Sequence, residues 1–194
     1  MTTTRTTGRI ALTAALALAG SIAVASPALA EDLECRGTLG AVTVTGNLLV
    51  PDDATCVLDG TSVLGTIVVK SRSTLQATAV EATGGLQGES PSTVVVRGSE
   101  FGNGVALRKA ELNAGRIELT GNTVTGDVQL AENRNPIRVE DNDVVGSVQA
   151  EKNTGGTEIT GNRIGNGLQC QANLPAPVGG GNVAKQKQGQ CVAL

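Results

Sequence analysis

Three consecutive stretches of the chain align with one another without a gap: IELTGNTVTGDVQLAENRNP (117–136), IRVEDNDVVGSVQAEKNTGG (137–156) and TEITGNRIGNGLQCQANLPA (157–176). In each stretch, short runs that alternate apolar and polar residues are separated by glycine and asparagine. Alternation with a period of two indicates strands, and the glycines and asparagines indicate corners, where a positive φ is common. A 20-residue repeat of short strands predicts a parallel β-solenoid with turns stacked about 4.8 Å apart.

The repeat extends beyond these three stretches. The pattern Gly-x-x-apolar-x-Gly-x-apolar-x-apolar of residues 121–130 recurs at 60–69, and a version with a shifted second glycine occurs at 98–107 and 161–170. A leucine-rich repeat would need Leu-x-x-Leu-x-Leu and a helical segment in each unit. We therefore expect an all-β fold, a single right-handed parallel β-helix of roughly 20-residue turns that occupies residues 31–194.

The period also assigns the two sides of each strand. The positions expected to point inward are Ile117, Leu119, Val124, Val128 and Leu130, with their counterparts Ile137, Val139, Val144 and Val148. Opposite charges are expected to stack outside in the sets Glu118, Arg138 and Glu158; Glu132 and Lys152; Asp143 and Arg163. Amide ladders are expected in the sets Asn122, Asn142 and Asn162; Asn133, Asn153 and Asn173; Gln129, Gln149 and Gln169. Stacked pairs of opposite charge contribute roughly 0.2–1 kcal/mol each.

The four cysteines form two equally spaced pairs. Cys35 and Cys56 are 21 residues apart, as are Cys170 and Cys191. Because one turn has about this length, each pair is expected on neighbouring turns, within the usual disulfide Cα separation of roughly 4.4–6.8 Å. The sequence therefore predicts a disulfide staple at each end. A zinc site is the alternative, and the absence of histidine and of Cys-x-x-Cys disfavours it.

Residues 1–30 have the features of a signal peptide. Arg5 and Arg9 precede an uncharged run over 10–24, and Ala28-Leu-Ala30 provides a cleavage site. The expected mature chain, 31–194, is secreted and extracellular and has no membrane span, because no later stretch approaches about 20 apolar residues. The alternative is an uncleaved amino-terminal anchor. Without the two arginines the net charge falls from −3 to −5, which makes nucleic acid an unfavourable partner.

The ends of the expected β-helix carry a resemblance to a known family. The opening 37–44 (GTLGAVTV), the repeated Gly-x-Val-Gln and the ending 167–182, followed by Gly189-Gln-Cys191, stand behind a signal peptide. This combination resembles small secreted right-handed parallel β-helix proteins of actinobacteria, whose function is unassigned. The resemblance implies the fold and export, and it implies no catalytic residue.

Composition restricts the function more than any motif does. The chain has no His, Trp or Tyr, and one Phe, which excludes histidine-based triads and zinc motifs and leaves no aromatic platform for sugars or bases. We expect a secreted non-catalytic structural or interaction protein without a cofactor, with a cell-wall component or another exported protein as its partner. The alternative, which rests on fold analogy, is a carbohydrate-directed enzyme or binder of the pectate-lyase-like type.

One acidic segment is the candidate cation site. Glu140, Asp141 and Asp143 surround Asn142, and oxygen ligands of this kind suit Ca²⁺. The cluster occurs in a single turn, which favours a solvated corner instead. If one of these acids were catalytic, it would be Asp141 or Glu140, because neither has an opposite charge in register.

Overall fold

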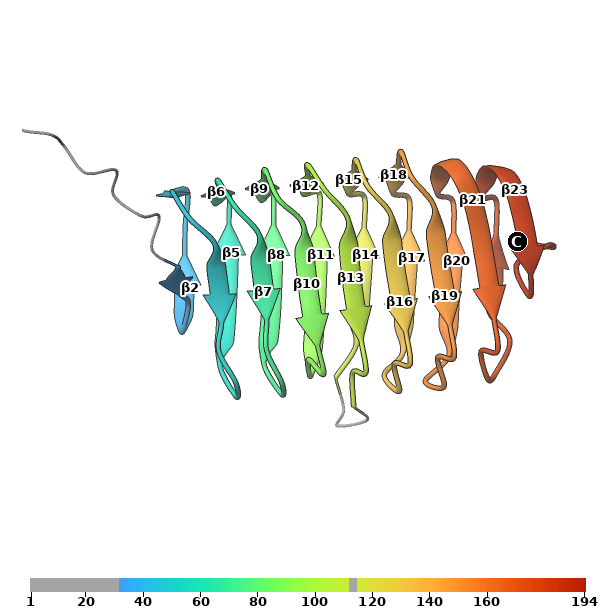
Figure 1. The fold of residues 1–194 in the computed structure, drawn as a ribbon, viewed down its shortest axis with the longest axis horizontal. Helices are drawn as coiled ribbons and strands as arrows, with labels where there is room; N and C mark the ends of the chain where they lie inside the picture. Colours follow the sequence, from blue (N-terminus) through green and yellow to red (C-terminus); the bar gives the residue numbers. More distant parts are fainter. Residues whose placement is uncertain (1–31, 112–114) are drawn as a thin grey trace, which may run out of the picture.

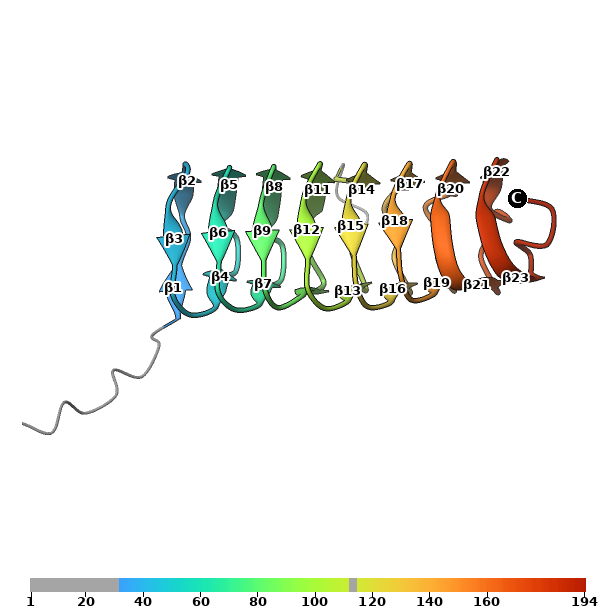
Figure 2. The ribbon, with the colours of Figure 1, turned by 90° about the horizontal axis from the view of Figure 1, so that it is seen from above.

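The computed structural model describes residues 32–111 and 115–194. The predicted signal peptide, 1–30, lies outside the described residues. Throughout the described part the regular elements are β-strands, which coil into a parallel β-solenoid of about eight turns (Figures 1 and 2). The described residues contain no helix that is long and apolar enough to cross a membrane.

Each turn contributes a strand to three faces, which we call faces 1, 2 and 3 in chain order. Face 1 consists of β2 (Gly37–Leu39), β5 (Thr55–Asp59), β8 (Thr74–Thr78), β11 (Thr93–Arg97), β14 (Ile117–Thr120), β17 (Ile137–Glu140), β20 (Thr157–Thr160) and β22 (Val178–Gly180). Face 2 consists of β3 (Thr43–Val44), β6 (Ser62–Val63), β9 (Glu81–Ala82), β12 (Glu100–Phe101), β15 (Thr123–Val124) and β18 (Asp143–Val144). Face 3 consists of β1 (Leu33–Glu34), β4 (Leu48–Val50), β7 (Ile67–Val69), β10 (Leu86–Glu89), β13 (Val105–Arg108), β16 (Val128–Ala131) and β19 (Val148–Glu151). The long strands β21 (Arg163–Gln171) and β23 (Val183–Gly189) run through both face 2 and face 3.

The register gives the length of each turn. Leu75 pairs with Val94, which is a turn of 19 residues, and Val94 pairs with Ile117, a turn of 23. Ile117 pairs with Ile137, and the turns keep this length of 20 up to β20. The predicted fold and the period after Ile117 are thus confirmed, whereas the front turns are one residue shorter.

The core consists of the inward side chains of all three faces. All nine predicted inward positions between Ile117 and Val148 are at most 4% exposed. Phe101 and Leu130 are among the largest fully buried side chains. Each such apolar side chain contributes roughly 1.5–3 kcal/mol when it is removed from water. The buried apolar residues, most of them small, form one continuous cluster.

Two ladders of asparagine amides run through the interior. The Asn142 Oδ1 atom accepts hydrogen bonds from the backbone N–H and from Nδ2 of Asn122, both at 2.9 Å. Asn162 repeats these contacts one turn later, at 3.0 and 2.9 Å. Asn133, Asn153 and Asn173 form the second ladder in the same way. Both predicted asparagine ladders are confirmed.

The positive φ at the corners belongs to the residue before each ladder position. Gly121 (φ 64°), Asp141 (53°) and Gly161 (69°) precede the first ladder, and Glu132 (59°) and Lys152 (52°) precede the second. The expectation that the asparagines themselves have a positive φ is wrong. A left-handed residue turns the chain so that the next side chain points into the interior, which leaves the asparagine free to form the ladder.

Both predicted disulfides are confirmed, with Cα separations of 5.5 Å for Cys35–Cys56 and 5.2 Å for Cys170–Cys191. The spacing of 21 is nevertheless not the length of a turn. Cys56 lies in register with Gly37, and Cys170 with Gly189. Each outer cysteine is therefore displaced by two residues beyond the register position, toward the nearer end of the chain.

The carboxy-terminal residues fold over the last turn. The Gln190 side-chain Oε1 accepts hydrogen bonds from Asn173 N and Nδ2, at 2.8 and 3.2 Å, and so takes the place of the next asparagine in the second ladder. Leu194 is 8% exposed. Lys187 lies in register with the buried Leu168, in a column that is otherwise apolar, and its Nζ donates to the backbone oxygen of Leu194.

Candidate functional site

The acidic cluster is spread around a corner. Glu140 ends β17 on face 1, and its register partners are Thr120 and Thr160, so it has no opposite charge in register, as expected. It forms an ion pair instead with Arg138 of its own strand, at 3.3 Å. Asp141 occupies the exposed corner, Asn142 points inward, and Asp143 begins β18 on face 2. Within residues 32–111 and 115–194, no group of three or more His, Cys, Asp or Glu is placed to hold a metal ion. The structure does not bring these carboxylates together.

Face 1 carries two groups of ion pairs, one over β11 and β14 and the other over β17 and β20. Glu118 contacts Arg97 at 2.7 Å and Arg116 at 3.1 Å, while Arg138 contacts Glu158 at 2.9 Å. The predicted register of Glu118, Arg138 and Glu158 is correct. Glu118, however, pairs with arginines on its other side, because Arg97 of the preceding turn and Arg116 of its own turn both reach it.

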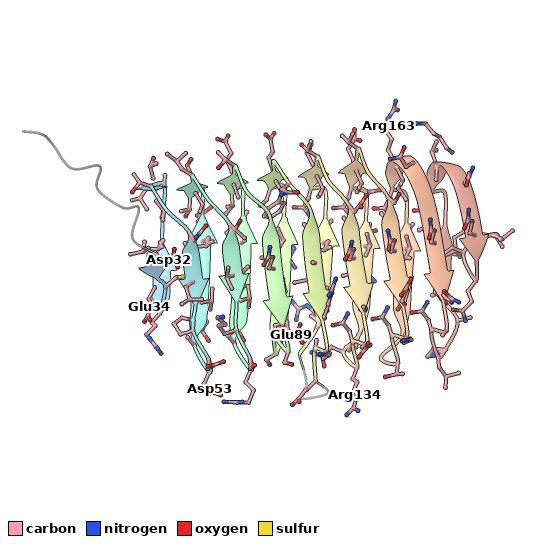
Figure 3. All side chains as sticks on the ribbon, in the orientation of Figure 1. Asp32, Glu34, Asp53, Glu89, Arg134 and Arg163 are labelled. Carbon is pink, nitrogen blue, oxygen red and sulfur yellow. A yellow bond between two sulfur atoms is a disulfide. The ribbon has the colours of Figure 1, made fainter. Side chains whose placement is uncertain are left out.

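The other two predicted charge stacks do not form ion pairs. Within the described residues, Asp143 and Arg163 are in register, but no contact within 4.0 Å joins their charged groups. Arg163 instead projects away from the rod (Figure 3). Glu132 and Lys152 occupy successive corners without such a contact. A corner position does not by itself prevent pairing, because Asp53 and Arg72 occupy successive corners of the same column as Glu132 and Lys152 and form an ion pair at 2.6 Å.

The pKa shifts that are resolved among the described residues all favour the charged form. The pKa of Glu118 is lowered: burial opposes ionisation, but hydrogen bonds from Arg116 and Arg97 outweigh it. The hydrogen bond between Asp53 and Arg72 lowers the pKa of the acid and raises that of the base. A hydrogen bond from Lys109 to Glu89 raises the pKa of Lys109. These shifts move the four groups away from the range needed for proton transfer at neutral pH.

We expect replacement Glu118→Gln to remove part of the acid sensitivity of the fold. Because the pKa of Glu118 in the folded protein is below its ordinary value of 4.5, its stabilisation is complete above that value and is lost as the pH falls through the folded pKa. Urea unfolding at about pH 6 and about pH 3 should show a difference smaller by about 1 kcal/mol in the variant. Glu100→Gln, on exposed face 2, is the control. An equal pH dependence in wild type and Glu118→Gln would contradict the assignment.

Face 3 has two adjoining shallow depressions. The larger, of about 410 Å³, is lined by Val68, Lys70, Glu89 and Arg108 among others, and the smaller is about 210 Å³. Both include Gln87 and Ala106. Gly85, Gly104 and Ala106, on two successive turns, line the smaller depression and contribute at most a methyl group to it.

A column of glutamines continues from this hollow toward the carboxy-terminal end. Gln129, Gln149, Gln169 and Gln188 are in register on β16, β19, β21 and β23. The predicted amide ladder does not form: in the described part of the chain, the side-chain amides of Gln149 and Gln169 have no hydrogen-bond partner. Gln129 accepts from Arg108 at 2.8 Å. Outward amides can bond to water instead, whereas the buried asparagines are shielded from water and bond to one another and to backbone carbonyls.

Two further depressions lie elsewhere on the rod. One of about 340 Å³ on face 2 lies over Gly102 and is flanked by Glu81 and Glu100, which are in register. The other, of about 380 Å³, lies at the corners between face 3 and face 1 and is lined by Lys109, Glu132 and Arg134 among others. Arg134 projects from this edge of the rod (Figure 3). Sequence reasoning missed all four hollows, because each depends on which turns lie next to one another.

In comparisons with known proteins, no family model, curated protein or solved structure matches this chain.

Proposed function

We propose that this chain is a secreted, non-catalytic structural or interaction protein of the cell exterior, a stiff rod whose long faces contact a cell-wall component or another exported protein. The observation that carries the proposal is the pair of buried asparagine ladders. They join neighbouring turns by side-chain hydrogen bonds in addition to the backbone. Satisfied buried networks of this kind hold one conformation rigidly, and rigidity suits a scaffold.

Export is supported by two separate features. The first thirty residues carry a basic start, an apolar run and a small-residue cleavage site. All four cysteines are joined in disulfides, which form and persist mainly in oxidising compartments such as the exterior of the cell.

The non-catalytic role is supported by the chemistry of the faces. General acid–base catalysis uses a group whose pKa lies near the working pH, whereas the resolved shifts of Glu118, Asp53 and Lys109 favour the charged forms. The alternative, a carbohydrate-directed binder, draws support from the hollow and the glutamines of face 3.

We expect the mature chain to leave uronate polymers uncleaved, with or without Ca²⁺, and its melting temperature to be unchanged by Ca²⁺. The reason is that Glu140 is paired and Asp141 and Asp143 diverge around the corner. Product formation and thermal unfolding are the measurements, with EDTA as the reference state. If Ca²⁺ raised the melting temperature and Asp141→Ala removed that rise, the cluster would be a cation site. Cleavage of the polymer would refute the non-catalytic role.

The role itself is tested by fractionating cells that express the full chain. We expect a product that begins at Glu31, has no free thiol, and is recovered in the medium or with the wall, from which it captures a partner. Retention inside the cell with reduced cysteines would refute export.

A further inference from the structure

We propose that face 3 binds a neutral β-linked glycan that lies along the solenoid axis, with one sugar unit over each turn. This inference rests on the proposed function and names the class of partner. The binding track consists of Gln129, Gln149, Gln169 and Gln188, and it continues into the hollow at Gln87 and Ala106.

The first argument is the repeat of the track. Register pairing places one glutamine on each of four consecutive turns, and parallel strands are spaced about 4.8 Å apart. A β-1,4-linked sugar chain advances by close to this distance per unit, so each sugar meets the same side chain. An extended peptide advances about 3.3 Å per residue and falls out of step with the turns.

The second argument is the hydrogen-bonding capacity of the track. A glutamine amide has both donors and an acceptor, and a sugar hydroxyl also has both functions. Part of this capacity is used within the protein at the two ends of the track, where Gln129 accepts from Arg108 and Gln188 donates to Gln186. Within the described residues, the amides of Gln149 and Gln169 are bonded to no other group, and both side chains are half-buried between their neighbours. They therefore present their amides to whatever lies on the face without first breaking internal hydrogen bonds.

The third argument is charge. The outward neighbours of Gln149 are Ser147 and Glu151, and those of Gln169 are Gly167 and Gln171. Among the described residues, none of these four neighbours is a cation, and the cations of the track, Arg108 on Gln129 and Lys70 in the hollow, lie at its front end. The chain as a whole is acidic, with a net charge of −3, so a neutral polymer is favoured over an acidic one.

The hollow at the front of the track fits the same occupant. Gly85, Gly104 and Ala106 leave the floor low, and Thr66, Asn103 and Asp127 stand around it. A sugar chain that follows the glutamines meets Arg108 at the edge of this floor, where its guanidinium donates to Gln129 at 2.8 Å. The rim supplies hydroxyl, amide and carboxylate groups, which are the usual partners of sugar hydroxyls.

The lack of aromatic residues determines how strong the binding is. Without a stacking platform, each sugar gains a few hydrogen bonds, worth a net 0.5–1.5 kcal/mol apiece. A disaccharide therefore binds too weakly to detect, whereas a long chain that spans several turns adds these contacts together.

The test is co-sedimentation of the mature, disulfide-bonded chain with insoluble chitin and cellulose, with soluble polygalacturonate as an acidic competitor. The test variant is Gln149→Glu with Gln169→Glu, which keeps the shape and removes the donors. The control is Thr55→Glu with Thr74→Glu, an equally charged pair in register on face 1. Thermal unfolding verifies that both variants fold, and Gln149→Ala with Gln169→Ala repeats the test without added charge.

We expect wild type and control to bind at least one neutral glycan, and both glutamine variants to bind about tenfold more weakly. Polygalacturonate should not displace wild type. Equal binding by the glutamine variants and the control would overturn the assignment of face 3. Retention by the wall fraction without binding to either glycan would overturn this inference and leave the proposed function intact, whereas failure of export and of wall or partner binding would overturn both.

Discussion

Replacing Asn142 with leucine should lower the free energy of unfolding by about 3 kcal/mol or more. Asn142 is 3% exposed, and its side chain joins three turns. The change removes the acceptor of the Asn122 N–H and the side-chain donor to the Leu119 carbonyl, while Asn162 Oδ1 loses one of its two donors and keeps the Asn142 N–H. An unsatisfied buried polar group costs about 1–3 kcal/mol, and two groups lose these side-chain bonds at once.

The measurement is urea unfolding followed by circular dichroism, and Asn166→Leu is the matched control. Asn166 is exposed and its Oδ1 accepts only from Lys185, at 3.3 Å, so the same substitution should have little effect there. If the two leucine variants were equally stable, the ladder would not contribute to stability.

Removal of the carboxy-terminal disulfide should have an effect of similar size. Cys170→Ser with Cys191→Ser opens a loop of 21 residues, and loss of such a cross-link costs about 3 kcal/mol through the entropy of the unfolded chain. The folded state changes as well, because Cys191 follows Gln190, the residue that ends the second ladder. Release of the tail should therefore expose Asn173.

Amide hydrogen exchange separates these two effects. In the Cys170 and Cys191 variant, the backbone N–H of Asn173 should exchange faster than the rest of the core. The control, Cys35→Ser with Cys56→Ser, should show a comparable loss of stability. In this control the Asn173 N–H should exchange no faster than the other amides of the core. Faster exchange at Asn173 in both variants would show that Gln190 is not held by Cys191.

The register of the second half of the chain could be predicted from its sequence, because the same residue type recurs at the buried ladder positions. Asn122, Asn142 and Asn162 recur at a fixed interval, since each side chain binds an identical one in the next turn. In the front half, three different residues, Thr61, Val80 and Ser99, occupy the positions that correspond to the first asparagine ladder. Because no residue type recurs at these positions, the sequence does not reveal the 19-residue turns.

At the front of the second ladder column, residues other than asparagine occupy the ladder position, and their backbone N–H groups are satisfied in other ways. Pro91 has no N–H and needs no acceptor from the next turn, while Ala54 and Ser73 donate their N–H groups within their own bends, to Pro51 and Lys70. Ala110 donates to Asn133 Oδ1, where the asparagines begin. Each solution satisfies the backbone locally, and none leaves a periodic signal.

The candidate surface was the least predictable feature. The glutamine column is visible as a repeat, but its free amides and the hollow beside it depend on neighbouring turns of different length. Likewise, Glu140 forms an ion pair with Arg138 on its own strand. The 20-residue period predicts contacts between turns only, so it does not predict this contact within a turn.

Lys187 affects whether the protein can assemble end to end at high concentration. A solenoid whose last turn ended in leucine would be a template on which further strands could grow, in the manner of a fibril. With Lys187 in the apolar column instead, a strand added at that end must displace the tail and separate the ammonium group from its partner, the Leu194 backbone oxygen. Burying a charge without its partner costs several kcal/mol, and inward charges are one means by which natural sheets avoid such growth. Lys187 and the tail together therefore oppose the addition of further strands at this end.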